Sequence, residues 1–93
     1  GMAPGAVLGL KQIGLKPTED VGVVTVDCSY ATLDSILAGE ITAAITCTPR
    51  GGELLFSCID KYYAGEELDE TYLVPMNTVT GDNAEELYDQ EGF

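Results

Sequence analysis

Polar side chains follow two apolar, β-favouring stretches of this sequence. Asp27 comes directly after the run VGVVTV (residues 21–26), and Thr48 follows the run ITAAITC (residues 41–47), which ends on Cys47. In open parallel sheets, ligands bind at the carboxyl ends of the strands. A carboxylate in that position can accept two hydrogen bonds from a molecule rich in hydroxyl groups. We therefore take Asp27, Cys47 and Thr48 as the ligand-binding candidates of the chain.

A purely structural role for Asp27 is also open. Aspartate often forms a turn with its own backbone or caps a helix that follows. A helix is expected to begin near Tyr30, three residues further on. Spacing alone leaves both interpretations of Asp27 standing.

The residue types exclude most familiar catalytic chemistry. The chain contains no histidine, so neither a Cys/His dyad nor a Ser/His/Asp triad can form within it. Cys28, Cys47 and Cys58 fit neither a CxxC redox motif nor the spacing of zinc ligands. The acidic run 66–70 lacks the alternating ligands and the glycine of a calcium loop. We expect a protein that is not an enzyme and that holds neither a metal ion nor a cofactor.

The cysteines leave one pairing open. Cys58 lies on an apolar helical stripe and is expected to act as a small buried hydrophobic residue. Cys28 and Cys47 occupy corresponding ends of what we expect to be neighbouring strands, within reach of a disulfide if their Cβ atoms face each other. The sequence permits either this bond or two free thiols.

Length and charge limit the partners. Ninety-three residues make one domain at most, and 45% hydrophobic residues are enough for it to fold. The net charge of -12 repels phosphate backbones and anionic membranes, which argues against nucleic acid as a partner. No apolar run reaches the length of a membrane span and no signal peptide is recognised, so we expect a soluble chain. Gly1 is set aside as a residue left by removal of a tag.

The first half of the chain alternates helical and extended patterns. Apolar residues recur at three- and four-residue steps up to Gly14, which predicts a first helix that ends there. The run 21–26 is short, rich in β-branched residues and apolar on both faces, as in a strand that is buried on both sides. Ser29 is placed to cap a short helix that Gly39 ends. The second strand is predicted over 41–47.

The second half begins with the longest predicted helix. Pro49 falls where a first helical turn tolerates proline, and the helix carries one apolar face as far as Gly65. The run 71–74 favours a strand that Pro75 interrupts, and 77–80 extends it. This order of elements predicts an α/β fold, an open parallel sheet with crossover helices.

Several short pieces, in their order along the chain, resemble the carboxyl-terminal portion of type I periplasmic sugar-binding proteins, the ribose- and galactose-binding kind. These pieces are MAPGAVLGL at 2–10, the strand that ends in Asp27, AGE at 38–40, AGEE at 64–67 and LVPMNTVT at 73–80. The resemblance runs from Met2 to about Asn83. It implies that residues 2–83 form part of one lobe of such a protein and that residues 84–93 are an acidic tail, a short helix or a frayed end.

The resemblance also implies a function. In that family, the aspartate after the strand commonly bonds to sugar hydroxyls, a position that Asp27 matches. The family often has Gln or Asn after the next strand, where this chain has Cys47 and Thr48. Its members work outside the cytoplasm as the solute-binding components of ABC transporters, with a membrane permease as partner. The first hypothesis is thus a sugar- or polyol-binding module, in the periplasm or at the cell surface.

The second hypothesis is an interaction module without a working pocket. Family members close two lobes around the sugar, and this chain matches part of one lobe. Apolar surface that the missing parts would cover favours pairing with a second copy. The sequence therefore also predicts a homodimer or swapped oligomer, in which the same fold serves as a dimerising or regulatory domain.

Overall fold

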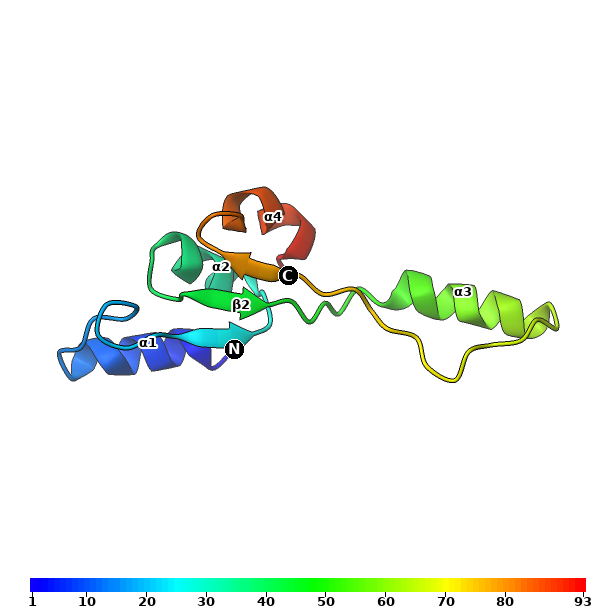
Figure 1. Cartoon of the computed structure of the whole chain (residues 1–93), viewed down its shortest axis with the longest axis horizontal. Helices are drawn as coiled ribbons and strands as arrows, with labels where there is room; N and C mark the ends of the chain where they lie inside the picture. Colours follow the sequence, from blue (N-terminus) through cyan, green and yellow to red (C-terminus); the bar gives the residue numbers. More distant parts are fainter.

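The computed structural model describes all 93 residues, which form four helices and three strands (Figure 1). In chain order these elements are α1 (Ala3–Gln12), β1 (Val24–Val26), α2 (Tyr30–Leu37), β2 (Ala43–Ile45), α3 (Gly52–Tyr63), β3 (Thr78–Thr80) and α4 (Ala84–Glu91). The α/β class is confirmed. Each strand is three residues long, shorter than the apolar runs that predicted β1 and β2.

The sheet is mixed, with the strand order β1-β2-β3. β1 and β2 are parallel, as predicted, with Val24 opposite Ala43 and Val26 opposite Ile45. β3 is antiparallel to β2, so the parallel arrangement does not extend to the third strand. The predicted strand at 71–74 is also wrong, because that segment pairs with no strand.

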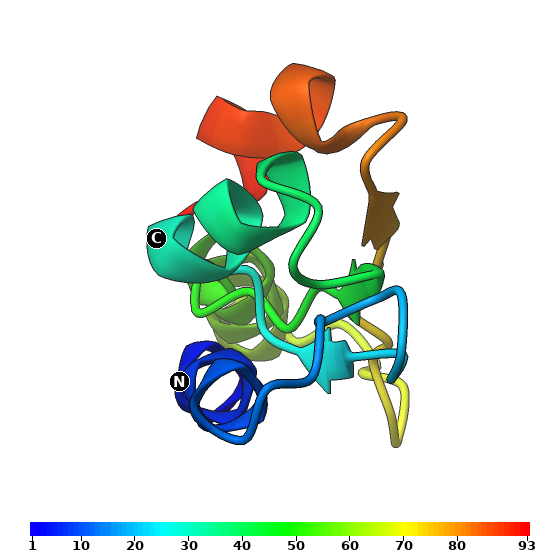
Figure 2. The same cartoon turned by 90° about the vertical axis from the view of Figure 1, so that its left-hand side faces the viewer.

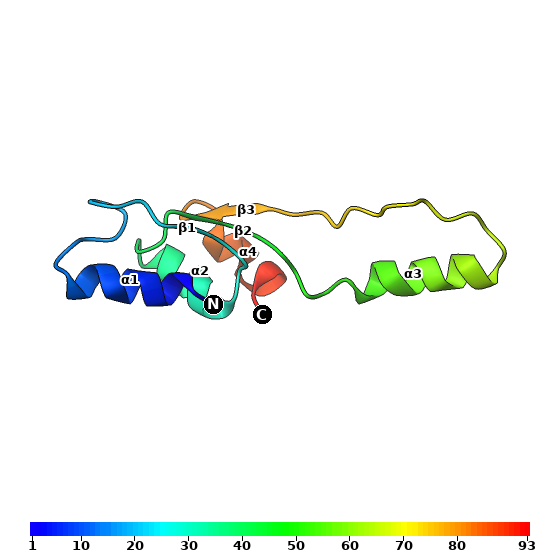
Figure 3. The ribbon, with the colours of Figure 1, turned by 90° about the horizontal axis from the view of Figure 1, so that it is seen from below.

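The direction of β3 follows from the path of the chain. A parallel strand needs a crossover connection that returns to the starting end of the sheet. Figure 3 shows instead that α3 lies beyond the sheet and that the chain comes back beside its outgoing path. It therefore enters β3 from the end at which it left β2.

One face of the sheet carries the core. α1, α2 and α4 lie on this face (Figure 2). Ala44 and Val79 point into it, and Leu33 of α2 is fully buried there. On the other face Val24 and Val26 are 74% and 59% exposed. Burial of β1 on both faces, as its composition predicts, is therefore wrong for this chain: no element covers the second face.

The predicted helix ends are confirmed. Gly14, Gly39 and Gly65 follow α1, α2 and α3, each with a positive φ that only glycine adopts at little cost. Ser29 is the N-cap of α2, and its hydroxyl accepts a hydrogen bond from the backbone N–H of Thr32 at 3.4 Å. α4 forms within residues 84–93, and its first residue, Ala84, is fully buried.

The longest helix differs most from its prediction. α3 begins at Gly52, so Pro49 lies before the helix and not in its first turn. None of its residues is buried, and its apolar stripe, which includes Leu55 and Ile59, is largely exposed to solvent. We call residues 46–51 the outgoing segment, 52–71 the arm and 72–77 the return segment. All the rest is the body, and the arm stretches the molecule to 60 × 23 × 15 Å.

No helix in the structure combines the length and apolar character that a membrane crossing requires.

Candidate functional site

Asp27 directly follows β1 in an unusual backbone conformation. Its φ is 83°, a value that side-chain-bearing residues rarely adopt. Its N–H donates to the carbonyl of Ile45 at 2.9 Å, which continues the parallel pairing one residue beyond the strands. The residue is half-buried, and its carboxylate takes part in neither of the two ion pairs of the chain. The nearby side-chain hydrogen bonds join Thr25 to the carbonyl of Val26 and Ser29 to Thr32. Because none of them involves the Asp27 carboxylate, it is free to accept hydrogen bonds from another molecule.

Asp27 does not cap the helix that follows it, which was the structural alternative for this residue. The N-cap of α2 is Ser29, two residues later, which bonds to Thr32. Asp27 therefore makes the bend between strand and helix without capping the helix. Whether it contacts a ligand stays a prediction.

The end of β2 brings a second group of polar side chains to the same edge. Thr46 is 2% exposed, and its hydroxyl accepts a hydrogen bond from the N–H of Asn77 at 2.8 Å. Cys47 is exposed. Thr48 is half-buried, and its hydroxyl accepts from the N–H of Arg50 at 3.1 Å. Because β1 and β2 are parallel and in register, the structure brings Asp27, Cys47 and Thr48 to one edge of the sheet.

Cys28 lies behind this edge. It is fully buried, and this burial raises the pKa of its thiol, with the negative charges of Glu91 and Asp27 adding to the effect. A raised pKa keeps the thiol protonated and unreactive near neutral pH. All three cysteines are free, so the structure contains no bond between Cys28 and Cys47.

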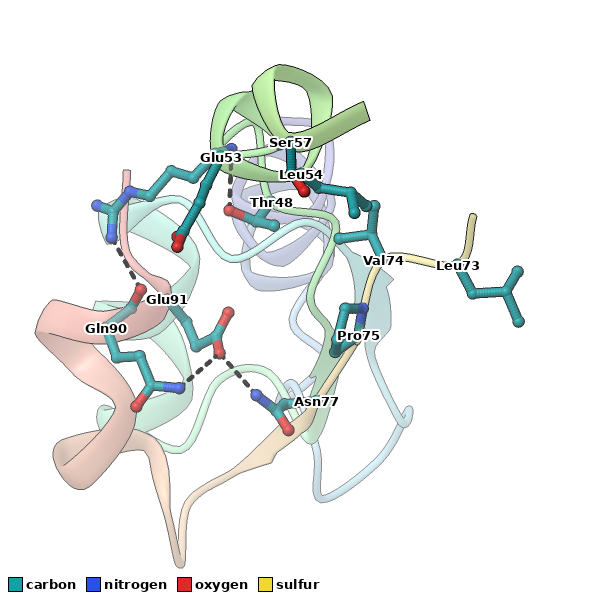
Figure 4. A pocket seen from close by; sticks show the side chains of 12 residues that line it. Thr48, Glu53, Leu54, Ser57, Leu73, Val74, Pro75, Asn77, Gln90 and Glu91 are labelled. Carbon is teal, nitrogen blue, oxygen red and sulfur yellow. Dashed lines mark hydrogen bonds between the residues drawn. The ribbon is translucent and has the colours of Figure 1, made fainter. Parts of the chain in front are cut away.

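A hollow of about 830 Å³ opens beside the edge, between the outgoing and return segments (Figure 4). Thr48 lines it, together with Arg50, Asn77 and Glu91. Asp27 and Cys47 do not line it.

The sequence did not single out Arg50, Asn77 or Glu91. Arg50 donates two hydrogen bonds, to the carbonyls of Gln90 at 2.8 Å and Gly92 at 2.5 Å. Glu91 is only 8% exposed and accepts from the Asn77 amide at 2.6 Å. One signal was available: Arg50 is one of four basic residues and lies on a connection between a strand and a helix.

No three side chains among the Asp, Glu and Cys residues gather closely enough to hold a metal ion. The site offers hydrogen-bond acceptors and donors from Asp27, Thr48 and Asn77, and these are suited to a neutral polar ligand.

No protein-family model and no curated protein matches the chain. Several solved structures match it in fold. A galactofuranose-binding protein superposes with a TM-score of 0.81 at 25% identity, over 94% of this chain and 30% of that one. The periplasmic binding protein component of the arabinose ABC transporter from Shewanella sp. ANA-3, bound to α- and β-L-arabinofuranose, gives 0.81 at 28% identity, over 97% and 30%. A Mycobacterium smegmatis structure in complex with β-D-fucofuranose gives 0.79 at 25% identity, over 91% and 28%.

These matches confirm the resemblance that the sequence motifs indicated. Nearly the whole chain has the fold of one part of a periplasmic sugar-binding protein of the ABC-transporter type. The chain spans about 30% of the length of the structures it matches.

Proposed function

We propose that this chain is the sugar-binding part of a solute-binding protein for ABC-type transport and that its ligand is a sugar in the furanose form. It acts without catalysis, outside the cytoplasm, and delivers sugar to a membrane permease. The observation that carries the proposal is the match of more than nine-tenths of the chain to proteins whose named ligands are galactofuranose, arabinofuranose and fucofuranose.

Asp27 supplies the main polar contact in this proposal. Its carboxylate is unpaired within the chain and accepts hydrogen bonds from two neighbouring sugar hydroxyls. The strained φ of 83° supports this role, because such conformations gather at functional sites. Thr48 lies at the same edge and offers a hydroxyl that both donates and accepts. Cys47 contributes an exposed thiol as a weaker contact.

Titration of the ¹⁵N-labelled chain with the methyl furanosides of L-arabinose, D-galactose and D-fucose, whose rings are locked in the furanose form, tests the proposal by NMR chemical shifts. One wall of a two-lobed site holds sugar weakly, with a Kd on the order of 1 mM. We expect shifts at the amides of Asp27 and Thr48. The variant Asp27→Asn keeps the shape but loses the charged acceptor, so binding weakens about tenfold. Asp82→Asn, which removes the same charge from an exposed turn far along the chain, leaves binding unchanged.

A second candidate is an interaction module in which the binding edge is vestigial. Two observations favour it: Asp27 does not line the hollow, and a large apolar surface is uncovered. This candidate predicts no chemical-shift change with any of the three sugars at 50-fold excess over the expected Kd, on the order of 50 mM. The same titration therefore distinguishes the two functions.

A further inference from the structure

Cys47 and Thr48 lie on opposite sides of the outgoing segment. Successive side chains of an extended chain point to opposite faces. The burial of this stretch alternates in the same way, because Thr46 is buried while Ile45 and Cys47, before and after it, are exposed. Thr48 continues the side of Thr46, since it lines the hollow beside the end of α4 (Figure 4). Cys47 therefore continues the other side, that of Ile45.

These two sides offer a ligand different chemistry. On the side of the helices, the Thr48 hydroxyl accepts from the N–H of Arg50, which leaves its own proton free to donate. On the other side, Cys47 follows Ile45, which lies beside Val26 and lines the same apolar groove. None of these three side chains carries a strong hydrogen-bonding group. The edge is thus polar toward the helices and apolar on the opposite side.

Asp27 lies close enough to Cys47 for one small sugar to contact both residues. The N–H of Asp27 donates to the carbonyl of Ile45, so Asp27 lies beside Thr46, and Cys47 is one residue further along. A strand spacing of about 4.8 Å and a rise of about 3.3 Å per residue place the Cα atoms of Asp27 and Cys47 about 6 Å apart. A furanose ring with its exocyclic chain has a similar length.

The contact with Asp27 limits which part of the sugar is left for Cys47. In the proposed function, the Asp27 carboxylate accepts from two neighbouring hydroxyls. A furanose ring has one such pair, on C2 and C3. The exocyclic chain is attached to C4, directly beyond that pair, and in a hexose it extends further from the ring than any other group. We therefore expect the exocyclic chain to reach the Cys47 thiol.

A thiol favours a methyl group over a hydroxyl at that place. Sulfur is a weak hydrogen-bond donor and acceptor, and a free cysteine behaves as a small apolar residue. A hydroxyl that leaves water for the thiol exchanges strong hydrogen bonds for a weak one. A methyl group has no hydrogen bonds to lose, and its contact with the thiol removes apolar surface from water.

We infer that Cys47 is a specificity-determining residue and that the preferred ligand is a deoxy sugar, a hexofuranose whose exocyclic chain ends in a methyl group that contacts the Cys47 thiol. The inference rests on the proposed function, because it names the class of sugar that the same site takes. Asp27 and Thr48 hold hydroxyls of the sugar, and Cys47 selects the end of the exocyclic chain.

The three methyl furanosides test the inference, because their rings have the same configuration and they differ only in the exocyclic chain. This chain ends in a methyl group in the D-fucoside and in a CH₂OH group in the D-galactoside, and it is one carbon shorter in the L-arabinoside. NMR titrations under reducing conditions, which keep the thiol free, give the Kd of each sugar. We expect the native chain to bind the fucoside about fivefold more tightly than the galactoside.

Three variants show whether the thiol causes this preference. Cys47→Ser supplies a hydroxyl that donates and accepts, so the preference for the fucoside disappears. Cys47→Ala stays apolar and keeps the preference. Cys58→Ser, the same substitution on α3, is the matched control and also keeps it. The ¹⁵N spectrum of each variant shows that it is folded.

Equal affinity of the native chain for the fucoside and the galactoside, or an unchanged preference in Cys47→Ser, overturns the inference and leaves the proposed function standing. An equal effect of Cys47→Ser on all three sugars shows that the thiol contacts a part that they share, which overturns the inference as well. If Cys47→Ser does not fold, Cys47→Ala decides, and a lost preference there overturns the inference. Binding of none of the three sugars overturns the proposed function and the inference together.

Discussion

At the residue scale, Asp27 is both a candidate binding residue and a position at which the backbone conformation costs folding free energy. Its φ of 83° lies in the left-handed region, where a side chain costs free energy that glycine does not pay. Only Thr18 shares this feature among the residues other than glycine. The strained backbone and the free carboxylate of Asp27 both support its proposed role in binding.

The variant Asp27→Gly separates these two roles. We expect its free energy of unfolding to rise by about 1 kcal/mol, since relief of the strained φ outweighs the added freedom of the unfolded chain. The proposed sugar binding falls at the same time, because the acceptor is gone. Urea denaturation measures the first effect. Asp27→Asn, which keeps a side chain of the same size at the same φ, is the control, and we expect it to gain little stability. A loss of stability in Asp27→Gly would contradict this account of the backbone.

At the scale of elements, α4 is attached to α2 through aromatic and charged side chains. The Tyr88 hydroxyl donates to Oδ1 of Asp34 at 2.7 Å, and its ring lies 5.3 Å from that of Tyr30. The hydrogen bond to Asp34 raises the pKa of Tyr88, with burial and nearby negative charge adding to the effect. This contact helps to hold the end of α4 in place, including Glu91, which accepts a hydrogen bond from Asn77.

Alkaline pH should loosen this contact. A pKa that is higher in the folded than in the unfolded chain favours folding below the unfolded value, about 10 for tyrosine. That stabilisation is lost as the pH rises from there through the raised folded pKa. We expect the stability of the native chain to fall over this window relative to Tyr88→Phe, which has no proton to lose. Urea midpoints of both proteins at a series of alkaline pH values measure the difference, and parallel curves would show that the hydrogen bond does not stabilise the fold.

The elements also show where sequence reasoning succeeds. Gly39 and Ser29 could be assigned as helix boundaries because caps act over a few residues of the chain. The parallel pairing of β1 and β2 followed from the helix between them, and it placed Asp27 and Thr48 at one edge. These features depend on local chemistry and on the handedness of connections.

The predictions that were wrong concern residues whose structure depends on contacts with distant parts of the fold, which the local sequence does not specify. The apolar stripe of α3 predicts a buried face, but Leu55 and Ile59 on that stripe are exposed in this chain. The β-favouring run 71–74 had no strand beside it, so propensity alone was not enough. The sequence places Glu91 in an acidic tail, because only the folded chain brings it to Asn77.

At the scale of the whole molecule, the chain exposes unusual amounts of apolar surface. Only 14 of its 93 residues are buried. The bare face of the sheet forms an apolar groove lined by Val24, Val26 and Ile45 and by no charged residue. Surfaces of this kind on a folded protein mark interfaces. We expect a second copy of the chain to cover this face, because no charged residue lines it and two such faces can pair without burying a charge.

We therefore predict a dimer that pairs these sheet faces and becomes tighter with salt. The net charge of -12 on each copy opposes association, and this repulsion is screened as the Debye length falls from about 10 Å at 0.1 M to about 3 Å at 1 M salt. Size-exclusion chromatography with light scattering should give a mass that moves from monomer toward dimer as NaCl is raised. Val24→Glu places a charge on the face and should weaken the dimer at least tenfold. Gln12→Glu, which adds the same charge on exposed α1, should weaken it only slightly. A monomer at every salt concentration, or equal weakening by both variants, would show that the bare face does not pair with its copy.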